Sequence, residues 1–356
     1  MTGDILKQRF GVTEVMAFIN PEAPNVTAVT HQLQAVEERF GTVVSTFESE
    51  ARTADTLEKF HEKHAKRTSK ETLIIVEGGD GQAHLWAEIL QHPDTPEAAK
   101  DALTLYDANG TKCDTANSLN IRELLKNPAQ LLADERAHID TIRPFEFTFQ
   151  TPDDDEGVRT ATRNVLSYAG VGADGIAATC IELAKPGFKE LVAKYGRLGK
   201  IAQRCLEPAV VLQASWASPT FTLHEVDEPQ HPMKSENVLQ WLVRNGPRMA
   251  GYRTAHVPLT RPEVAISTTQ STAQGARRSG TVIGNGLRLA TRTLPAEIHN
   301  LEHGARSWQL SDIQDGVLYG EADGEPFAMA PGYIAIEAAR PLRVITTKPH
   351  SHREIA

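Results

Sequence analysis

Residues 77–81 combine glycines and carboxylates in a pattern that can hold a phosphate group. The stretch reads Glu77-Gly78-Gly79-Asp80-Gly81, between an apolar run at 73–76 and a helix-forming segment at 83–90. Glycine leaves no Cβ between a turn and a ligand, so backbone N–H groups can point at an anion near the helix N-terminus. Asp80 would then meet a metal ion or a reacting hydroxyl. The same pattern also fits an ordinary tight connection between strand and helix, because one glycine cluster is weak evidence.

The elements around this turn alternate between strands and helices. Short apolar runs predict strands at 15–19, 43–47, 73–76 and 102–106. Apolar residues at helical spacing predict helices at 29–40, 51–66 and 83–90, and another helix can begin near Asp114. Alternation of this kind over residues 15–135 is typical of a parallel α/β sheet with right-handed crossovers.

Polar or glycine-bearing loops follow three of the predicted strands. These loops contain Asn20-Pro21, Gly78-Gly79-Asp80-Gly81 and Asn109-Gly110-Thr111. In open α/β sheets the ligand lies beyond the carboxyl ends of the strands. We therefore expect the three loops to converge on one site, and a phosphate-bearing ligand suits them best.

The second part of the chain has a different pattern of apolar and polar residues. Residues 145–149 alternate strictly between apolar and polar, as in a strand with one solvated face. A strand at 165–169, a glycine-rich interruption at 170–175 and helices at 176–183 and 189–206 are predicted next. Short alternating stretches between turn residues continue from 210 to 345, which predicts an antiparallel sandwich.

Two charged stretches each allow two interpretations. The carboxylates at 153–156 suit either a calcium loop or a solvated hairpin, and the regular ligand alternation of a calcium loop is missing. Arg197, Lys200 and Arg204 form a one-sided basic stripe at helical spacing. That stripe would face either lipid headgroups or water.

Composition excludes several classes of protein. The length of 356 residues suits two domains, and no apolar run reaches the roughly 20 residues that span a bilayer. The first ten residues lack a secretory signal, and the three cysteines have neither metal-ligand nor disulfide spacing, so we expect a cytoplasmic protein. The net charge of -9 argues against a general nucleic-acid binder, and no nucleic-acid partner is expected.

Four short motifs follow one another in order along residues 14–346. They are Asn20-Pro21, Gly78-Gly79-Asp80-Gly81, Gly110-Thr111-Lys112-Cys113-Asp114-Thr115-Ala116 and Asp323-Gly324-Glu325-Pro326. Each motif alone is common, but the ordered set resembles the diacylglycerol kinase and sphingosine kinase superfamily of lipid kinases, especially its soluble bacterial members.

The resemblance implies a fold and an activity. The fold would be an N-terminal α/β domain of NAD-kinase-like type and a C-terminal antiparallel β-sandwich, with ATP and Mg²⁺ in the cleft between them. We place the nucleotide-binding domain at 1–142, the acceptor-binding domain at 143–346 and a tail at 347–356. The activity would be ATP-dependent phosphorylation of a hydroxyl on a lipid or lipid-like acceptor, of diacylglycerol or sphingoid-base type, with transient membrane contact. The alternatives are a catalytically weak relative that binds nucleotide or lipid as a regulator, and a kinase for a non-lipid metabolite.

The resemblance also nominates individual residues. Glu325 would be the general base that takes the proton of the acceptor hydroxyl, unless it is only a surface hairpin carboxylate, and Asp80 would organise metal and phosphates or serve as the rival base. The residues expected around ATP are Asn20, Pro21, Thr46, Gly78, Gly79, Gly81, Gly110, Thr111 and Asp323. Asp114 and Asp174 are the candidates for acceptor contacts, and no metal ligands are assigned.

The sequence departs from the family pattern around the expected phosphates. Glu22 adds negative charge to the first loop, Gln82 stands where the family usually has threonine, and Cys113 stands where it usually has asparagine. The family often has Asp-Gly where this chain reads 261–264 without it. These changes favour a specialised kinase or the catalytically weak relative.

Overall fold

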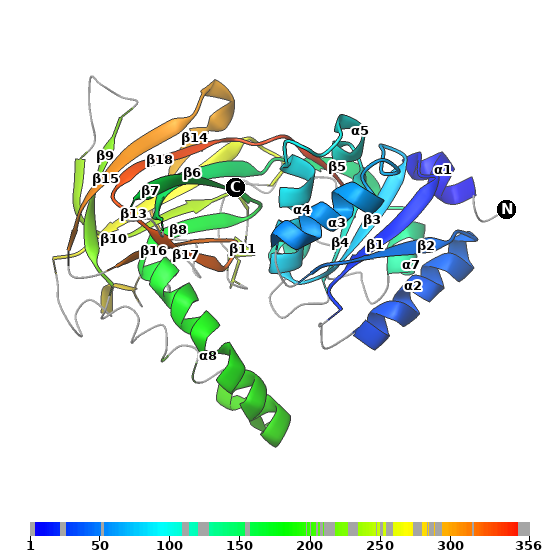
Figure 1. Cartoon of the computed structure of the whole chain (residues 1–356), viewed down its shortest axis with the longest axis horizontal. Helices are drawn as coiled ribbons and strands as arrows, with labels where there is room; N and C mark the ends of the chain where they lie inside the picture. Colours follow the sequence, from blue (N-terminus) through cyan, green and yellow to red (C-terminus); the bar gives the residue numbers. More distant parts are fainter. Residues whose placement is uncertain are drawn as a thin grey trace.

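The computed structural model forms two domains that lie side by side along the long axis of the molecule (Figure 1). It describes residues 4–21, 26–50, 53–108, 114–119, 128–153, 157–196, 198–199, 201–203, 206, 209, 218–226, 234–246, 248–249, 252–253, 259–272, 280–282, 284, 288, 294–314 and 317–347.

The first domain is built on a six-stranded sheet. Its strands, in spatial order, are β2 (Val44–Glu48), β1 (Glu14–Ile19), β3 (Thr72–Gly78), β4 (Leu103–Ala108), β19 (Leu342–Thr346) and β5 (His138–Ile142). The pairs from β2 to β19 are parallel, and β5 runs antiparallel to β19. The predicted parallel α/β domain is therefore confirmed.

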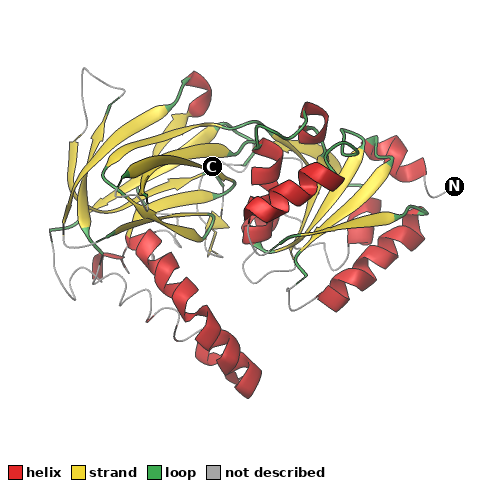
Figure 2. Cartoon of the chain, in the orientation of Figure 1, coloured by secondary structure: helices red, strands yellow, loops and turns green. Residues whose placement is uncertain are grey.

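Helices flank this sheet (Figure 2). They are α1 (Asp4–Phe10), α2 (Val26–Phe40), α3 (Thr53–Lys63), α4 (Asp80–Gln91), α5 (Glu97–Lys100), α6 (Asp114–Ser118) and α7 (Pro128–Ala133). The apolar run of β3 is completely buried, as expected for a central parallel strand covered on both faces. Aromatic rings fill the core between α3, α4 and the sheet, with Trp86 packed against both Phe18 and Phe60.

The second domain is an antiparallel sheet of eleven strands that curls around its own core. The spatial order is β17 (Glu325–Met329), β16 (Leu318–Ala322), β8 (Tyr168–Gly172), β10 (Lys234–Arg244), β9 (Thr220–Glu225), β15 (Arg306–Gln314), β18 (Gly332–Ala338), β6 (Phe145–Pro152) and β7 (Val158–Val165), with β13 (Glu263–Gln270) beside β10 and β14 (Glu297–Asn300) beside β13. Phe149 of β6 stacks on Phe327 of β17 with ring centroids 4.1 Å apart. Because these strands lie toward opposite ends of the sheet order, the contact shows how far the sheet curls.

Smaller elements complete the second domain. They are the long helix α8 (Ala173–Tyr195), the short pair β11 (Arg248–Met249) and β12 (Tyr252–Arg253), and the 3₁₀ turn η1 (Leu301–His303). The 153–156 run lies at the β6–β7 hairpin, where the N–H of Asp153 donates to the carbonyl of Gly157 and residues 154–156 lie outside the described part. Among the described residues, no group of three or more His, Cys, Asp or Glu side chains could hold a metal ion, and no helix has the length and apolar character needed to cross a membrane.

The predicted strand at 165–169 and helix at 176–183 differ from the structure. The chain turns at Leu166 and Ser167, between β7 and β8. The glycine-rich stretch belongs to the end of β8, where Gly172 has φ +90° and a Cβ atom would lie 2.4 Å from the Leu239 carbonyl oxygen. Helix α8 begins directly after this glycine and continues through Pro186 to Tyr195. Residues 189–195 of the predicted second helix thus belong to α8, and Arg197, Lys200 and Arg204 lie outside the described residues.

The strand β19 lies within the range 143–346 that we expected to form the second domain, but it pairs in the first sheet. The chain therefore passes between the domains twice, from β5 to β6 and from β18 to β19. The two passages run together, because the N–H of Ala339 donates to the carbonyl of Pro144. This double connection fixes the interface at which the candidate site lies.

Candidate functional site

The glycine turn joins β3 to α4 as predicted. Gly78 ends the strand with φ +157°, and a Cβ atom at this position would lie 2.8 Å from Cβ of Gln82. Gly79 is the N-cap of α4, and because glycine has no side chain, the start of this helix has no side-chain cap. A residue with a side chain would be strained at position 78, so the close packing of this turn requires glycine there.

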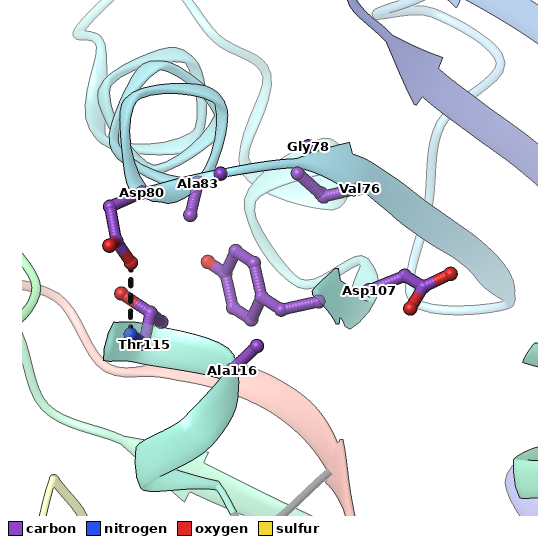
Figure 3. Close-up of a pocket in the computed structure, with 9 residues that line it drawn as sticks. Val76, Gly78, Asp80, Ala83, Asp107, Thr115 and Ala116 are labelled. Atoms are coloured by element: carbon purple, nitrogen blue, oxygen red, sulfur yellow. Dashed lines mark hydrogen bonds between the residues drawn. The ribbon is translucent and has the colours of Figure 1, made fainter. Parts of the chain in front are cut away.

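A small recess lies beside the turn (Figure 3). It is lined by residues of β3, α4, β4 and α6, namely Val76, Gly78, Gly79, Asp80, Ala83, Tyr106, Asp107, Thr115 and Ala116. The Asp80 side chain points from α4 toward α6, where its Oδ1 accepts a hydrogen bond of 3.0 Å from the Thr115 N–H. Asp80 thereby ties the first turn of α4 to the first turn of α6.

The strand register brings the ends of the central strands to one edge. Ile19 of β1 lies beside Glu77 of β3, and Gly78 of β3 lies beside Ala108 of β4. Asn20 and Pro21 follow directly after Ile19, so they lie at the same edge as the glycine turn. The expected convergence of the loops holds for these residues. Gly110, Thr111, Glu22 and Cys113 fall outside the described residues, as does the side chain of Asp114.

Thr46 is not brought to the recess. It lies on the edge strand β2 beside Ala17, which is level with Ile75, three positions before Gly78. Its side chain is exposed, and it is not among the residues that line the recess.

Glu325 reaches the glycine turn from the second domain. It is the first residue of β17, and its Oε1 lies 3.1 Å from the position that a Cβ atom on Gly81 would take. Gly81 is in the first turn of α4, directly after Asp80. The two base candidates therefore come from different domains: Asp80 belongs to the first turn of α4, and Glu325 lies beside that turn.

Asp323 is buried and fully engaged at the turn between β16 and β17. Its carboxylate accepts hydrogen bonds from the N–H groups of Leu166 (2.7 Å), Ser167 (2.7 Å) and Tyr168 (3.1 Å), and it lies 3.2 Å from Nδ1 of His84. Its own backbone has φ +49°. These contacts give Asp323 a positioning role: it holds the β7–β8 turn and the residue pair that leads into Glu325.

His84 links Asp323 to a second carboxylate on α4. Nδ1 faces Asp323, and Nε2 lies 3.2 Å from Oε1 of Glu88, a contact with the distance of an ion pair but without hydrogen-bond alignment. Glu88 in turn pairs with Arg163 of β7 at 3.1 Å. Burial would lower the pKa of His84, but the two carboxylates outweigh it and raise that pKa to about 10. Burial likewise opposes ionisation of Glu88, yet His84 and Arg163 hold the pKa of Glu88 below its usual value. We call Arg163, Glu88, His84 and Asp323 the interdomain charge chain.

Asp174, the second residue of α8, covers a part of the curled sheet close to the strand that carries Glu325. A Cβ atom on Gly170 would lie 3.2 Å from Asp174 Oδ2 and 3.3 Å from Glu321 Oε1, so both carboxylates cover Gly170. Glu321 pairs across the strands with Pro326, the residue after Glu325. Burial raises the pKa of Asp174 to about 6, although Gln240 donates a hydrogen bond of 2.7 Å to its carboxylate, which opposes that rise.

Tyr106 and the interdomain charge chain are site features that sequence reasoning missed. Tyr106 lines the recess, and its buried hydroxyl has no hydrogen-bond partner among the described residues. Burial and the nearby charge of Asp323 raise the pKa of Tyr106 well above its usual range. In the sequence, Tyr106 and Asp107 stand at the end of a predicted strand, just before a predicted ligand loop. This position is the feature that could have identified Tyr106 as a residue of the site.

No protein-family model matches the chain, and no curated protein sequence matches it. Solved structures match over nearly its whole length. A diacylglycerol kinase from Bacillus anthracis str. Sterne superposes with a TM-score of 0.59 at 16% identity, covering 94% of this chain and 96% of that chain. A second structure from the same strain, provisionally described as a diacylglycerol kinase, has a TM-score of 0.58 at 16% identity and covers 94% and 97%. Yeast NADH kinase complexed with NADH aligns over 96% and 85% at 8% identity, with a TM-score of 0.47. The chain therefore has the two-domain fold of these diacylglycerol kinase structures, an α/β domain followed by a curled antiparallel β domain, which confirms the fold that the four motifs implied.

Proposed function

We propose that this protein is an ATP-dependent, Mg²⁺-requiring kinase that phosphorylates a hydroxyl group on a lipid or lipid-like acceptor. One observation carries the proposal: the Glu325 carboxylate lies against Gly81 in the first turn of α4, next to Asp80. This carboxylate belongs to the second domain and lies beside the helix that follows the glycine turn. It suits a base acting between a nucleotide and an acceptor bound on opposite sides of the interface.

The residues of the turn fit the phosphates of a nucleotide. Gly79 makes no side-chain cap, and the helix macrodipole places partial positive charge at the start of α4. Gly78 and Gly79 line the recess without adding side-chain atoms beyond Cα. A phosphate could thus approach the backbone more closely here than at any turn made of larger residues.

The carboxylates also fit Mg²⁺. This ion keeps several waters and is usually held by one or two carboxylates together with substrate phosphates, so it does not need a cage made only of protein ligands. Asp80 can supply such a carboxylate. Bound Mg²⁺ would neutralise the charge that develops on the transferring phosphoryl group.

The chain's own residues would act as follows. Glu325 orients the acceptor hydroxyl and takes its proton as the hydroxyl oxygen bonds to the γ-phosphorus and the bond from that phosphorus to ADP breaks. Asp80 keeps α4 and α6 together through the Thr115 N–H. The interdomain charge chain links α4 to the second domain, and its contact between His84 and Asp323 holds the turn before Glu325 against α4.

A second candidate is a catalytically weak relative that binds nucleotide or lipid as a regulator. The observation in its favour is that Asp80 already accepts a hydrogen bond from α6, which reduces the capacity of its carboxylate for a metal ion. Gln82 and the altered loop residues Glu22 and Cys113 point the same way.

An acceptor screen separates the two candidates. Purified protein is incubated with ATP labelled in the γ-phosphate, with and without Mg²⁺, and with diacylglycerol, a sphingoid base and small polyols in turn. The kinase proposal predicts a labelled product with a lipid acceptor, only when Mg²⁺ is present. Labelling of a polyol alone would move the acceptor to a non-lipid metabolite. ATP binding without any labelled acceptor would support the second candidate, a catalytically weak regulator.

A further inference from the structure

Tyr106 places a buried hydroxyl group at the recess beside the glycine turn. The residue lies on β4, directly beside Val76 of β3, and it is 2% exposed. Its hydroxyl has no hydrogen-bond partner among the described residues, although the large majority of buried polar side-chain atoms in folded proteins have one. A buried hydroxyl in this state, at the wall of a recess, is a candidate for contact with a bound ligand.

The size of the recess limits what can reach this hydroxyl. The recess has a volume of about 10 Å³, which is the space of a single water-sized group. A nucleobase or a sugar ring is far too large for it, whereas one oxygen atom of a larger ligand fits. The side chains of Val76, Ala83 and Ala116 line the recess and offer that oxygen no hydrogen bond. The Tyr106 hydroxyl can donate one, and it therefore gives the recess a preference for an oxygen atom.

The glycine turn favours an oxygen that belongs to an anion. Gly78 and Gly79 line the recess, and Gly79 is the N-cap of α4. The start of a helix carries partial positive charge and unpaired N–H groups, which together attract phosphate groups. A phosphate lying on the turn would thus have an oxygen beside the entrance to the recess.

Two carboxylates also line the recess, and neither occupies its centre. Oδ1 of Asp80 accepts a hydrogen bond from the Thr115 N–H, and the carboxylate of Asp107 points away from Asp80 (Figure 3). Mg²⁺ bound together with the phosphates would offset the charge of these carboxylates. Their presence is therefore compatible with a phosphate at the turn.

The Tyr106 hydroxyl keeps its proton. Burial and the nearby charge of Asp323 raise the pKa of Tyr106 well above its usual range. The hydroxyl is consequently a neutral donor, which can face a phosphate oxygen without bringing a negative charge of its own.

From the buried hydroxyl, the size of the recess and the glycine turn together, we infer that Tyr106 is a binding residue for the nucleotide phosphates. Its hydroxyl donates a hydrogen bond to one phosphate oxygen, which enters the recess. The inference rests on the proposed function, because that function supplies the nucleotide. It deepens the proposal by assigning a contact to a residue that belongs to none of the four motifs.

Binding of two probes to Tyr106→Phe tests the inference, because phenylalanine keeps the ring and removes only the hydroxyl. Kd is measured by calorimetry in the presence of Mg²⁺, for ATP and for tripolyphosphate, which carries phosphates without base or ribose. Both Kd values should rise about tenfold or more, as expected for the loss of a hydrogen bond to a charged group. The melting temperature of the ligand-free variant should equal or exceed that of the wild type, because no hydrogen bond within the protein is lost.

Two further variants show whether the effect belongs to the recess. Tyr333→Phe is the matched control, since it removes the hydroxyl of a tyrosine that is 41% exposed on β18, and both Kd values should stay at the wild-type level. Ala116→Val adds methyl groups to the wall of the recess and should raise both Kd values although Tyr106 keeps its hydroxyl. Wild-type affinity in Ala116→Val would show that no ligand atom enters the recess.

Other results would also overturn the inference. If both Kd values are unchanged in Tyr106→Phe, the hydroxyl does not contact the phosphates, while ATP binding and the proposed function remain. An increase for ATP alone would place the contact on the nucleoside. A lower melting temperature of the ligand-free variant would show that the hydroxyl has a partner within the protein. A wild type that binds neither probe would overturn the inference together with ATP binding.

The inference and the proposed activity can fail separately. If no acceptor is phosphorylated in the screen but both Kd values rise in Tyr106→Phe, the kinase proposal fails and the role of Tyr106 stands.

Discussion

Oε1 of Glu325 lies 3.1 Å from the place that a Cβ atom on Gly81 would occupy. This proximity joins the first strand position of β17 to the first turn of α4, across the boundary between the two domains. The proposed catalysis depends on this contact, because it brings a carboxylate of the second domain to the first turn of α4.

Gly81→Ala should lower turnover while leaving the fold intact. Alanine favours a helix, and the atom it approaches is the flexible end of a side chain, so Glu325 can move away by a few tenths of an ångström. We expect a change in the free energy of unfolding of about 0.5 kcal/mol or less, with a decrease in kcat of about tenfold. Gly157→Ala, where no heavy atom lies within 4 Å of the new Cβ, is the control for both measurements.

Gly78→Ala should damage the fold itself. The residue has φ +157°, and the new Cβ would lie 2.8 Å from Cβ of Gln82, which belongs to the helix and cannot simply rotate away. We expect a loss of about 1–3 kcal/mol in the free energy of unfolding, measured by urea denaturation. A variant as stable as the wild type would show that the turn can relax and that glycine is not required there.

His84→Asn should destabilise the protein and change its pH dependence. Removing the imidazolium leaves Asp323 and Glu88 as buried carboxylates without their shared partner, which costs about 3–5 kcal/mol. Because the folded pKa of about 10 lies above the ordinary value of 6.5, the stabilisation is complete below pH 6.5 and is lost as the pH rises toward 10. Urea denaturation at several pH values should show this decline in the wild type and a flatter profile in the variant. Equal slopes in the two proteins would contradict the charged state assigned to His84.

Asp174→Asn should change the pH dependence of stability on the acidic side. The folded pKa of about 6 lies above the ordinary value of 3.8, so the folded state binds more protons than the unfolded state between these values. Wild-type stability should therefore fall as the pH rises from 4 to 6, by about 2–3 kcal/mol, relative to the variant. The same variant should raise KM for the acceptor if Asp174 contacts it. Unchanged KM together with the altered pH profile would make Asp174 purely structural.

Much of the first domain could be predicted from the sequence because its signals are local. The apolar run of β3 is completely buried, the glycines after it form the predicted turn, and α4 follows. The family resemblance nominates Glu325 as the base, but the contact between Glu325 and Gly81 has no signal in the sequence, since no local pattern links residues so far apart in the chain.

The parts that sequence reasoning missed depend on contacts between distant segments. The sequence places Asp323 near the nucleotide but does not predict that its carboxylate accepts hydrogen bonds from three amide N–H groups at the β7–β8 turn. That turn in turn explains why the predicted strand at 165–169 is broken, because the amides of Leu166 and Ser167 leave the ladder to bind Asp323. The pairing of β19 in the first sheet also depends on distant segments. The alternation of apolar residues along a strand indicates which face is buried but not which sheet the strand joins.

The most direct test of the central claim is a comparison of phosphoryl transfer and ATP binding in the wild type and in Glu325→Gln. The amide keeps the size of the side chain but cannot accept the proton of an acceptor hydroxyl. With the acceptor found in the screen, we predict that the single-turnover rate falls about 10²–10⁴-fold, while Kd for ATP and the melting temperature stay near their wild-type values. A variant that transfers phosphate at the wild-type rate would contradict the account, because Glu325 would then lie at the interface without acting in the reaction.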